Sequence, residues 1–207
     1  NMVSHAHGQG YADLHYLIPE TVDLVHFGKG PYHTHYGNMA TAGYVGFQSL
    51  NMLEDNMISM EVGQFNTFRG LGMINLLNKS DQANTQNAYV AGEYFSSDGY
   101  FESPQNFKRI SLFGKYSGSL NKSNYLTGSI STFSSHWDAS GQIPLRAIES
   151  GEIGFFGAID DTEGGLTSRY NASIQLNSNL SNNDFFKNQF YYSKYRFELY
   201  SNFTFFL

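Results

Sequence analysis

The feature that most constrains this chain is an alternation of apolar and polar side chains with a period of two residues. The pattern is clearest over residues 170–177, where one set is apolar and the other polar: Tyr170, Ala172, Ile174 and Leu176 against Asn171, Ser173, Gln175 and Asn177. Successive side chains of a strand point to opposite faces of a sheet. The alternation therefore predicts strands that carry one apolar and one polar face.

This alternation and the turn-forming residues between its runs predict seven strands, over residues 41–51, 56–77, 87–97, 106–118, 123–135, 167–179 and 185–206. Short turns rich in Asn, Ser and Asp occupy residues 78–86, 120–122 and 180–184, whereas longer connections occupy 98–105 and 134–166. Short turns at one end and long loops at the other are typical of outer-membrane β-barrels. The connection near Glu54 and Asp55 is expected to be a short turn at the loop end.

Two architectures fit one-sided strands. In a transmembrane barrel the apolar side chains face lipid, whereas in a soluble sandwich they pack against a second sheet. The barrel interpretation expects Phe197 and Leu199 to face lipid, as Ile174 and Leu176 do, and the alternating Lys194, Arg196 and Glu198 to face the lumen. The run over 185–206 is much longer than the usual strand of about 5–6 residues, which favours the barrel.

Composition agrees with both architectures and excludes other classes. Only 14% of the 207 residues are charged and 16% are aromatic, against about 25% charged in ordinary soluble proteins. The net charge of −6 argues against binding to nucleic-acid phosphates. Without cysteine there is no disulfide or thiolate metal site. No apolar run reaches the roughly 18 residues that a membrane helix requires.

A family resemblance begins at a glycine-rich turn. Lys29-Gly30-Pro31-Tyr32, followed by His35-Tyr36-Gly37 and Ala40-Thr41-Ala42-Gly43, resembles the end of the plug in TonB-dependent outer-membrane receptors, where the chain enters the first barrel strand. Residues 6–14 and Ile18-Pro19-Glu20 resemble the central plug of that family. Residues 140–144 and 156–160, with Gly164-Gly165, resemble a long barrel loop.

The resemblance implies a mainly β fold: a partial transmembrane antiparallel barrel of about seven strands, preceded by the end of an α+β plug. Residues 1–39 would belong to the plug and 40–207 to the barrel, with an extracellular loop over 134–166. Both chain ends look cut, which predicts a fragment of a longer protein.

The implied function is TonB-dependent uptake of a scarce nutrient across the bacterial outer membrane. The nutrient class stays open between iron–siderophore, haem, cobalamin, another metal chelate and an oligosaccharide. The partners would be this ligand, the membrane, and a TonB-type energy-coupling protein that binds a segment absent here. The alternative is a soluble β-rich carbohydrate-binding or adhesion module. Neither interpretation is an enzyme or uses a cofactor, and no catalytic motif occurs.

Candidate ligand-binding residues come from the plug-like segment and from the loops: His5, His7, Gln9, Tyr11, His33, His35, Tyr100, Trp137 and Arg146. Six of the seven histidines lie in the first 35 residues, and neutral imidazole binds several transition metals. The carboxylates nearby are few, so we expect no metal site, with His5 and His7 the weak candidates. An acidic tip, Asp160, Asp161 and Glu163, is interpreted as a solvated turn.

Overall fold

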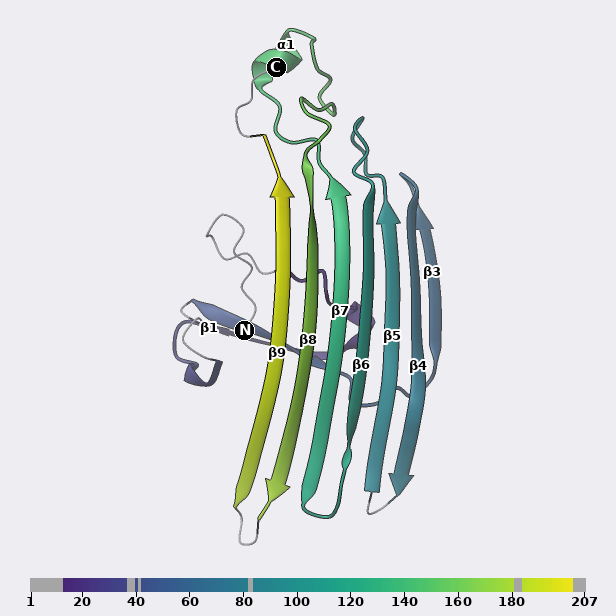
Figure 1. Cartoon of the computed structure of the whole chain (residues 1–207), viewed down its shortest axis with the longest axis vertical. Coiled ribbons are helices and arrows are strands. Elements are labelled where there is room, and N and C mark those ends of the chain that lie inside the picture. The colour runs from purple at the N-terminus through teal and green to yellow at the C-terminus, as the bar shows by residue number, and fades with distance from the viewer. Residues whose placement is uncertain (1–12, 37–39, 41, 82–83, 181–183, 203–207) are drawn as a thin grey trace.

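The chain folds around one long antiparallel sheet. The computed structural model describes residues 13–36, 40, 42–81, 84–180 and 184–202. The sheet has seven strands that follow one another in chain order: β3 (Met57–Gly63), β4 (Thr67–Asp81), β5 (Asn84–Ser97), β6 (Phe107–Ser119), β7 (Asn124–Asp138), β8 (Gly164–Asn179) and β9 (Phe185–Tyr200). Figure 1 shows these strands side by side as a tall curved wall. The expectation of a mainly β protein is confirmed.

A second, two-stranded sheet lies across one side of this wall (Figure 1). It consists of β1 (Val22–Lys29) and β2 (Gly43–Ser49), which pair antiparallel. The helical elements are short: η2 (Pro19–Thr21), η3 (Thr34–Tyr36) and α1 (Leu145–Glu149). Helix α1 begins after Pro144, and Gly151 follows it at a φ of 78°. Among the described residues, no helix is long and apolar enough to cross a membrane.

Two of the expected strands differ from the structure. The strand expected over 41–51 forms as β2, but it pairs with β1 instead of joining the large sheet. The strand expected over 56–77 divides into β3 and β4 at a turn over residues 64–66. Phe65 and Asn66 take φ angles of 58° and 54° there. The sequence gives little warning of this turn, because it contains no glycine and only Asn66 tolerates the left-handed region readily.

Two of the three loop-end connections are long, as expected, but the third, over residues 64–66, is as short as a turn. Residues 82–83, 120–123 and 180–184 join strands at one end, which we call the turn end. Residues 64–66, 98–106 and 139–163 join them at the other, the loop end, which is at the top of Figure 1. The connection containing Glu54 and Asp55 is not one of these hairpins; it links β2 to β3.

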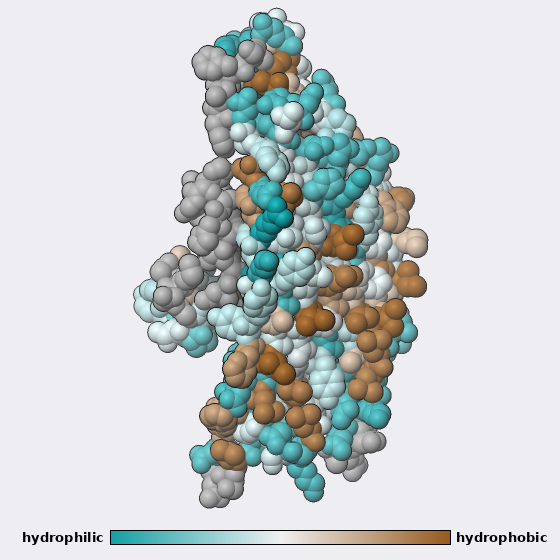
Figure 2. All heavy atoms as spheres, in the orientation of Figure 1, coloured by the Kyte–Doolittle hydropathy of each residue, from teal (hydrophilic) through white to brown (hydrophobic). Residues whose placement is uncertain are grey.

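The two faces of the seven-stranded sheet have different chemistry. One face carries exposed apolar side chains from every strand, such as Met60, Ile130 and Phe190, which are 76%, 66% and 72% exposed. We call it the apolar face, and Figure 2 is a view onto it. The opposite face, the polar face, carries buried polar side chains such as Glu93 and Arg169.

Strand β9 departs from the expected assignment of faces. Phe197 pairs with Thr167 and lies on the polar face, and Leu199 lies there too, so the expectation that both join Ile174 and Leu176 on the apolar face is wrong. Lys194, Arg196 and Glu198 occupy the apolar face instead. The apolar residues of β9 change sides near its middle. On the polar face the Tyr195 hydroxyl then donates to Asp13, and the ring of Phe197 lies near that of Trp137.

The band of apolar side chains on the apolar face runs obliquely across the strands. At the loop end, the last apolar residue of the band on β3 is Val62. The residues that lie opposite one another from strand to strand form a hydrogen-bonded row, and the row of Val62 passes through Lys108 to Glu198 on β9. On β9, however, the last apolar residue of the band is Tyr192, which is six residues (198 − 192) farther from the loop end than Glu198. With about 3.3 Å per residue and 4.8 Å per strand, six residues over six strand pairs correspond to an angle of about 35°. Figure 2 shows the brown band descending from upper right to lower left.

The polar face is covered in part by two segments that precede β3. A buried apolar cluster joins them to the sheet, with Ile18 and Leu53 from these segments and Leu71, Met73, Tyr89 and Ala91 from β4 and β5. Ile18 is only 2% exposed. The segment that carries Ile18 is therefore fixed to the wall by apolar burial as well as by polar contacts.

We expect Ile18→Ala to lower the free energy of unfolding by about 2–5 kcal/mol, because it removes buried methyl groups and leaves a cavity. The matched control is Ile130→Ala, the same substitution at a side chain that is 66% exposed. It should cost less than half as much. Denaturant titration of both variants measures the two values, and equal losses would contradict the burial of Ile18.

Candidate functional site

Residues 13–21, which we call the inner segment, lie across the polar face. At its first end, Asp13 Oδ2 accepts hydrogen bonds from the Tyr195 hydroxyl at 3.2 Å and from Thr167 Oγ1 at 3.3 Å. Close by, the Arg169 guanidinium lies 5.3 Å from the ring of Tyr16 and 5.6 Å from the ring of Tyr195. This end of the inner segment is thus attached to β8 and β9.

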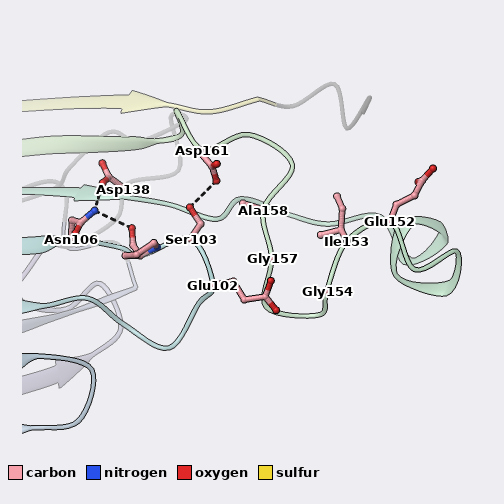
Figure 3. Close-up of a pocket in the computed structure, with 11 residues that line it drawn as sticks. Glu102, Ser103, Asn106, Asp138, Glu152, Ile153, Gly154, Gly157, Ala158 and Asp161 are labelled. Atoms are coloured by element: carbon pink, nitrogen blue, oxygen red, sulfur yellow. Dashed lines mark hydrogen bonds between the residues drawn. The ribbon is translucent and has the colours of Figure 1, made fainter.

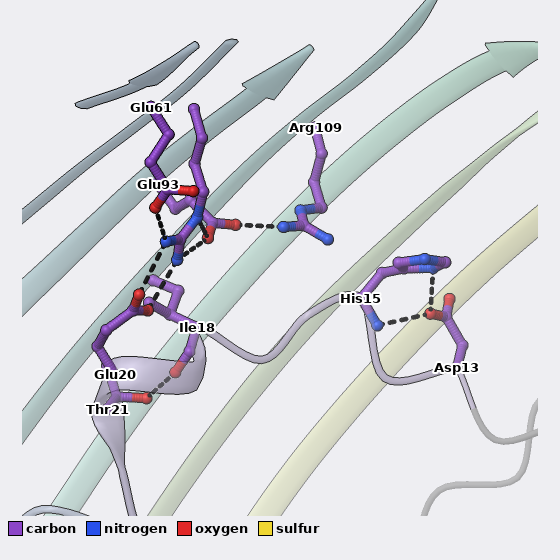
Figure 4. Close-up of polar contacts among 9 residues, drawn as sticks. Asp13, His15, Ile18, Glu20, Thr21, Glu61, Glu93 and Arg109 are labelled. Atoms are coloured by element: carbon purple, nitrogen blue, oxygen red, sulfur yellow. Dashed lines mark hydrogen bonds and ion pairs between the residues drawn. The ribbon is translucent and has the colours of Figure 1, made fainter. Parts of the chain in front are cut away.

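The other end of the inner segment is held by an ion pair. Arg69 on β4 donates from both terminal nitrogens to the two carboxylate oxygens of Glu20, at 2.8 and 2.7 Å. This bidentate geometry is the strong form of an arginine–carboxylate contact. Glu20 follows Pro19 in the short helix η2, which turns its side chain toward the wall (Figure 4). Glu20 therefore connects the inner segment to the opposite part of the sheet from Asp13.

Arg69 belongs to a larger charge network on the polar face. Its Nε donates to Glu93 Oε2 at 2.7 Å and its Nη1 to Glu61 Oε1 at 2.8 Å. Arg109 donates to the other oxygen of Glu93 at 2.5 Å. The Glu93 side chain is fully buried, and removing one member of a buried charge network typically costs about 3–5 kcal/mol. Figure 4 shows Glu20, Glu61, Glu93 and Arg109 converging.

A second segment, residues 49–56, is attached to the same face beside the network. Lys115 Nζ donates to the backbone oxygen and the hydroxyl of Ser49, both at 2.9 Å. Ser117 Oγ donates to the Asn51 carbonyl at 2.8 Å, and the Tyr89 hydroxyl donates to the Leu50 carbonyl at 3.1 Å. Side chains of the strands thus satisfy backbone groups of an irregular segment. The polar face is a docking surface for both segments.

The two carboxylates of the inner segment ionise more readily than usual. The hydrogen bonds from Arg69 hold the pKa of Glu20 below its ordinary value of 4.5. Burial raises the pKa of Asp13, but hydrogen bonds from His15 and Tyr195 outweigh it, so the net pKa is below the usual 3.8. A carboxylate with a lowered pKa in the folded state stabilises that state above its unfolded pKa. This contribution is lost as the pH falls through the lowered value.

The loop end contains a separate pocket of about 560 Å³, formed between residues 98–106 and 139–163. Its acidic lining residues are Glu102, Asp138, Glu152 and Asp161. Two of these carboxylates have partners, because Asn106 donates to Asp138 at 2.8 Å and Ser103 donates to Asp161 at 2.8 Å (Figure 3). In the described part of the chain, no three His, Asp or Glu side chains are grouped to hold a metal ion.

Aromatic side chains gather beside this pocket. The ring of Tyr100 lies 4.4 Å from that of Phe101, 5.8 Å from that of Phe156 and 6.4 Å from that of Phe65. These residues come from three different loop-end connections. Their mutual contacts hold the loops together, and Tyr100 remains 57% exposed.

The candidate ligand-binding residues do not form one site. His5, His7, Gln9 and Tyr11 lie outside the described residues. His33 and His35 are neighbours, with ring centroids 6.1 Å apart, and both rings lie near Tyr44 of the two-stranded sheet.

The other three candidates lie at the loop end. Tyr100 belongs to the aromatic group, Trp137 lies near Phe197, with ring centroids 6.2 Å apart, and Arg146 is exposed on helix α1. None of the described candidates lines the pocket.

The acidic tip is held by contacts within its own loop and with the neighbouring loop. Asp160 accepts hydrogen bonds from the backbone nitrogen and the hydroxyl of Thr162, at 2.8 and 2.6 Å, and these bonds lower its pKa. Asp161 is exposed and accepts a hydrogen bond from Ser103 of the neighbouring loop. Glu163 is only 8% exposed, so the interpretation as a solvated turn fits Asp161 but is wrong for Glu163.

The charge network on the polar face is not among the features predicted from the sequence. Its members Arg69, Glu93 and Arg109 are charged residues within strands of a chain that is only 14% charged. That rarity was the available signal, since a charge inside a strand requires a partner when the strand is buried.

Comparison of this chain with protein-family models, with curated proteins and with solved structures finds no match. The functional interpretation therefore depends on the geometry and the sequence alone.

The lowered pKa of Glu20 predicts that acid loosens the inner segment. A nitroxide spin label at Leu14→Cys, an exposed position in a chain without cysteine, should gain mobility as the pH falls from neutral to below 4.5. In a Glu20→Gln background the label should already be more mobile at neutral pH, because the ion pair with Arg69 is lost. A label at Ile174→Cys serves as the control. Equal mobility with and without Glu20 would contradict the attachment.

Proposed function

We propose that this chain forms part of a TonB-dependent outer-membrane transporter, comprising the end of its plug and the first strands of its barrel wall. Such a protein takes up a scarce nutrient across the bacterial outer membrane. The nutrient would be an iron–siderophore complex, haem, cobalamin, another metal chelate or an oligosaccharide. The observation that carries the proposal is the oblique apolar band on a face that no described residue covers.

The angle of the band fits a membrane wall. Strands of transmembrane barrels tilt by about 35–45° from the membrane normal. Their lipid-facing residues must then form a band that crosses the hydrogen-bonded rows at the same angle. The angle of about 35° derived from the strand registers agrees with this tilt. A soluble sandwich places no such requirement on its apolar residues, because they follow the second sheet.

The border of the band supports the same interpretation. At its loop-end border on β5, β8 and β9 the band terminates at Tyr94, Tyr170 and Tyr192, each followed toward the loops by a polar residue on the same face. Tyrosine is enriched where membrane proteins cross from hydrocarbon to water. Tyr191, the neighbour of Tyr192 in the chain, lies on the polar face and is not part of this border.

The inner segment supports the plug part of the proposal. It lies on the polar face, which would be the lumen side of a barrel, and polar and ionic contacts at both of its ends hold it there together with the buried Ile18. A plug that rearranges during transport requires contacts with the wall that water can replace. Large barrels of this kind have about twenty-two strands and a plugged lumen, so seven strands would make about a third of the wall.

Site-directed spin labelling tests the proposal. Because the chain has no cysteine, single labels can be placed at Ile174→Cys and Ser173→Cys, adjacent positions on opposite faces. In reconstituted membranes, the label at 174 should be accessible to oxygen dissolved in lipid, and the label at 173 should not. If both labels prove accessible only to a water-soluble relaxation agent, the soluble carbohydrate-binding or adhesion module is favoured.

The tilt has its own test within one hydrogen-bonded row. Met60 and Arg196 belong to the same row and the same face. A label at Met60→Cys should lie in lipid, whereas a label at Arg196→Cys should contact water. Equal depth for both labels would contradict the oblique band.

A further inference from the structure

The position of three charged residues of β9 is not explained by an apolar outer face. Lys194, Arg196 and Glu198 lie on the apolar face, directly beyond Tyr192, where the band ends. Lys194 pairs with Tyr170 and Arg196 with Ser168 of β8. Charged residues at this place are level with the border between the proposed hydrocarbon layer and water.

The cations of the apolar face gather at this border. Among the described strands, Lys108, Lys194 and Arg196 lie on this face at the loop end, whereas Lys79 is its single cation at the turn end. Lys108 follows the band on β6, next to Ile110, as Lys194 follows it on β9. The loops at this end carry many carboxylates, such as Glu102 and Asp138. The three cations are therefore not part of a generally basic region. They occupy the border itself.

We propose that Lys194 and Arg196 bind a phosphate group of a lipid in the membrane leaflet on the loop side. This inference rests on the proposed function. Two residues apart on one face, their side chains start about 7 Å from each other, close enough for one phosphorylated head group to reach both. The rings of Tyr170 and Tyr192 border the same place on the side of the band. A long cationic side chain can extend from the hydrocarbon border to the head groups.

Glu198 limits this site. It accepts hydrogen bonds from Arg196 Nε at 2.7 Å, from Arg196 Nη2 and from the Tyr200 hydroxyl at 2.9 Å. One edge of the guanidinium is therefore already occupied by a carboxylate, and a phosphate approaches Lys194 and the remaining edge. Glu198 thus holds Arg196 in place but opposes an anion. Its removal and the removal of Lys194 should have opposite effects on binding.

The test uses the protein as its gene encodes it, purified in detergent, with lipid A and the same lipid after enzymatic removal of its phosphates. Native mass spectrometry measures the dissociation constants. We expect tighter binding of the phosphorylated lipid. Lys194→Gln should weaken it about fivefold, since a basic residue near an anionic surface contributes about 1 kcal/mol. Glu198→Gln should strengthen it.

The matched control is Lys187→Gln, the same substitution on the same strand but on the polar face, where Lys187 pairs with Asn177. It should leave lipid A binding unchanged. Equal binding of the two lipids, or equal loss in both lysine variants, would overturn the inference. So would displacement of the lipid by inorganic phosphate in excess, which would assign the site to a free anion.

The failure of this inference is distinguishable from the failure of the proposed function. If the label at Ile174→Cys lies in lipid but the phosphates make no difference, only the lipid site is wrong. If that label lies in water, the membrane interpretation fails and the lipid site fails with it.

Discussion

The structure depends on the buried carboxylate of Glu93, which fixes two arginines of neighbouring strands on one face of the sheet. Arg69 and Arg109 each donate to one of its oxygens. Held in this way, Arg69 presents both terminal nitrogens to Glu20 of the inner segment. A buried charge is stable only when it is paired and hydrogen-bonded. The network therefore commits the inner segment to this face, and it leaves the other face with its apolar side chains uncovered.

These two faces make different demands on a sequence. The polar face has to satisfy the backbone of irregular segments, and Lys115, Ser117 and Tyr89 do so with side-chain donors. The apolar face needs only side chains of similar character along an oblique band, with glycine tolerated between them, as at Gly92 and Gly114. Exposed Ile and Phe side chains cannot form hydrogen bonds with water. A large continuous apolar surface of this kind is typical of a site that contacts lipid or another protein.

Much of the sheet could be predicted from the sequence because alternation is a local signal. Residues 170–177 alternate in the sequence as they do in β8, and the turn-forming residues mark most of the hairpins. Three features escaped because they depend on distant contacts. The turn at Phe65 and Asn66, which has no glycine, is hydrogen-bonded to Asp98. Strand β2 pairs with β1, and the polar face of β9 contacts Asp13 and Trp137. The charge network likewise joins residues far apart in the chain.

The exchange of faces by the apolar residues of β9 relates the attachment of the inner segment to the oblique apolar band. A strand with a single apolar face would place Phe197 and Leu199 on the apolar face of the sheet and its charges on the polar face. Instead Tyr195 and Phe197 complete the surface on which the inner segment rests, and the residues between them necessarily point outward. These charges lie beyond the apolar band, which ends at Tyr192 on β9 because it runs obliquely across the strands. In the proposed membrane wall, the attachment of the inner segment and the oblique course of the band would together determine where the cations of β9 meet the head groups.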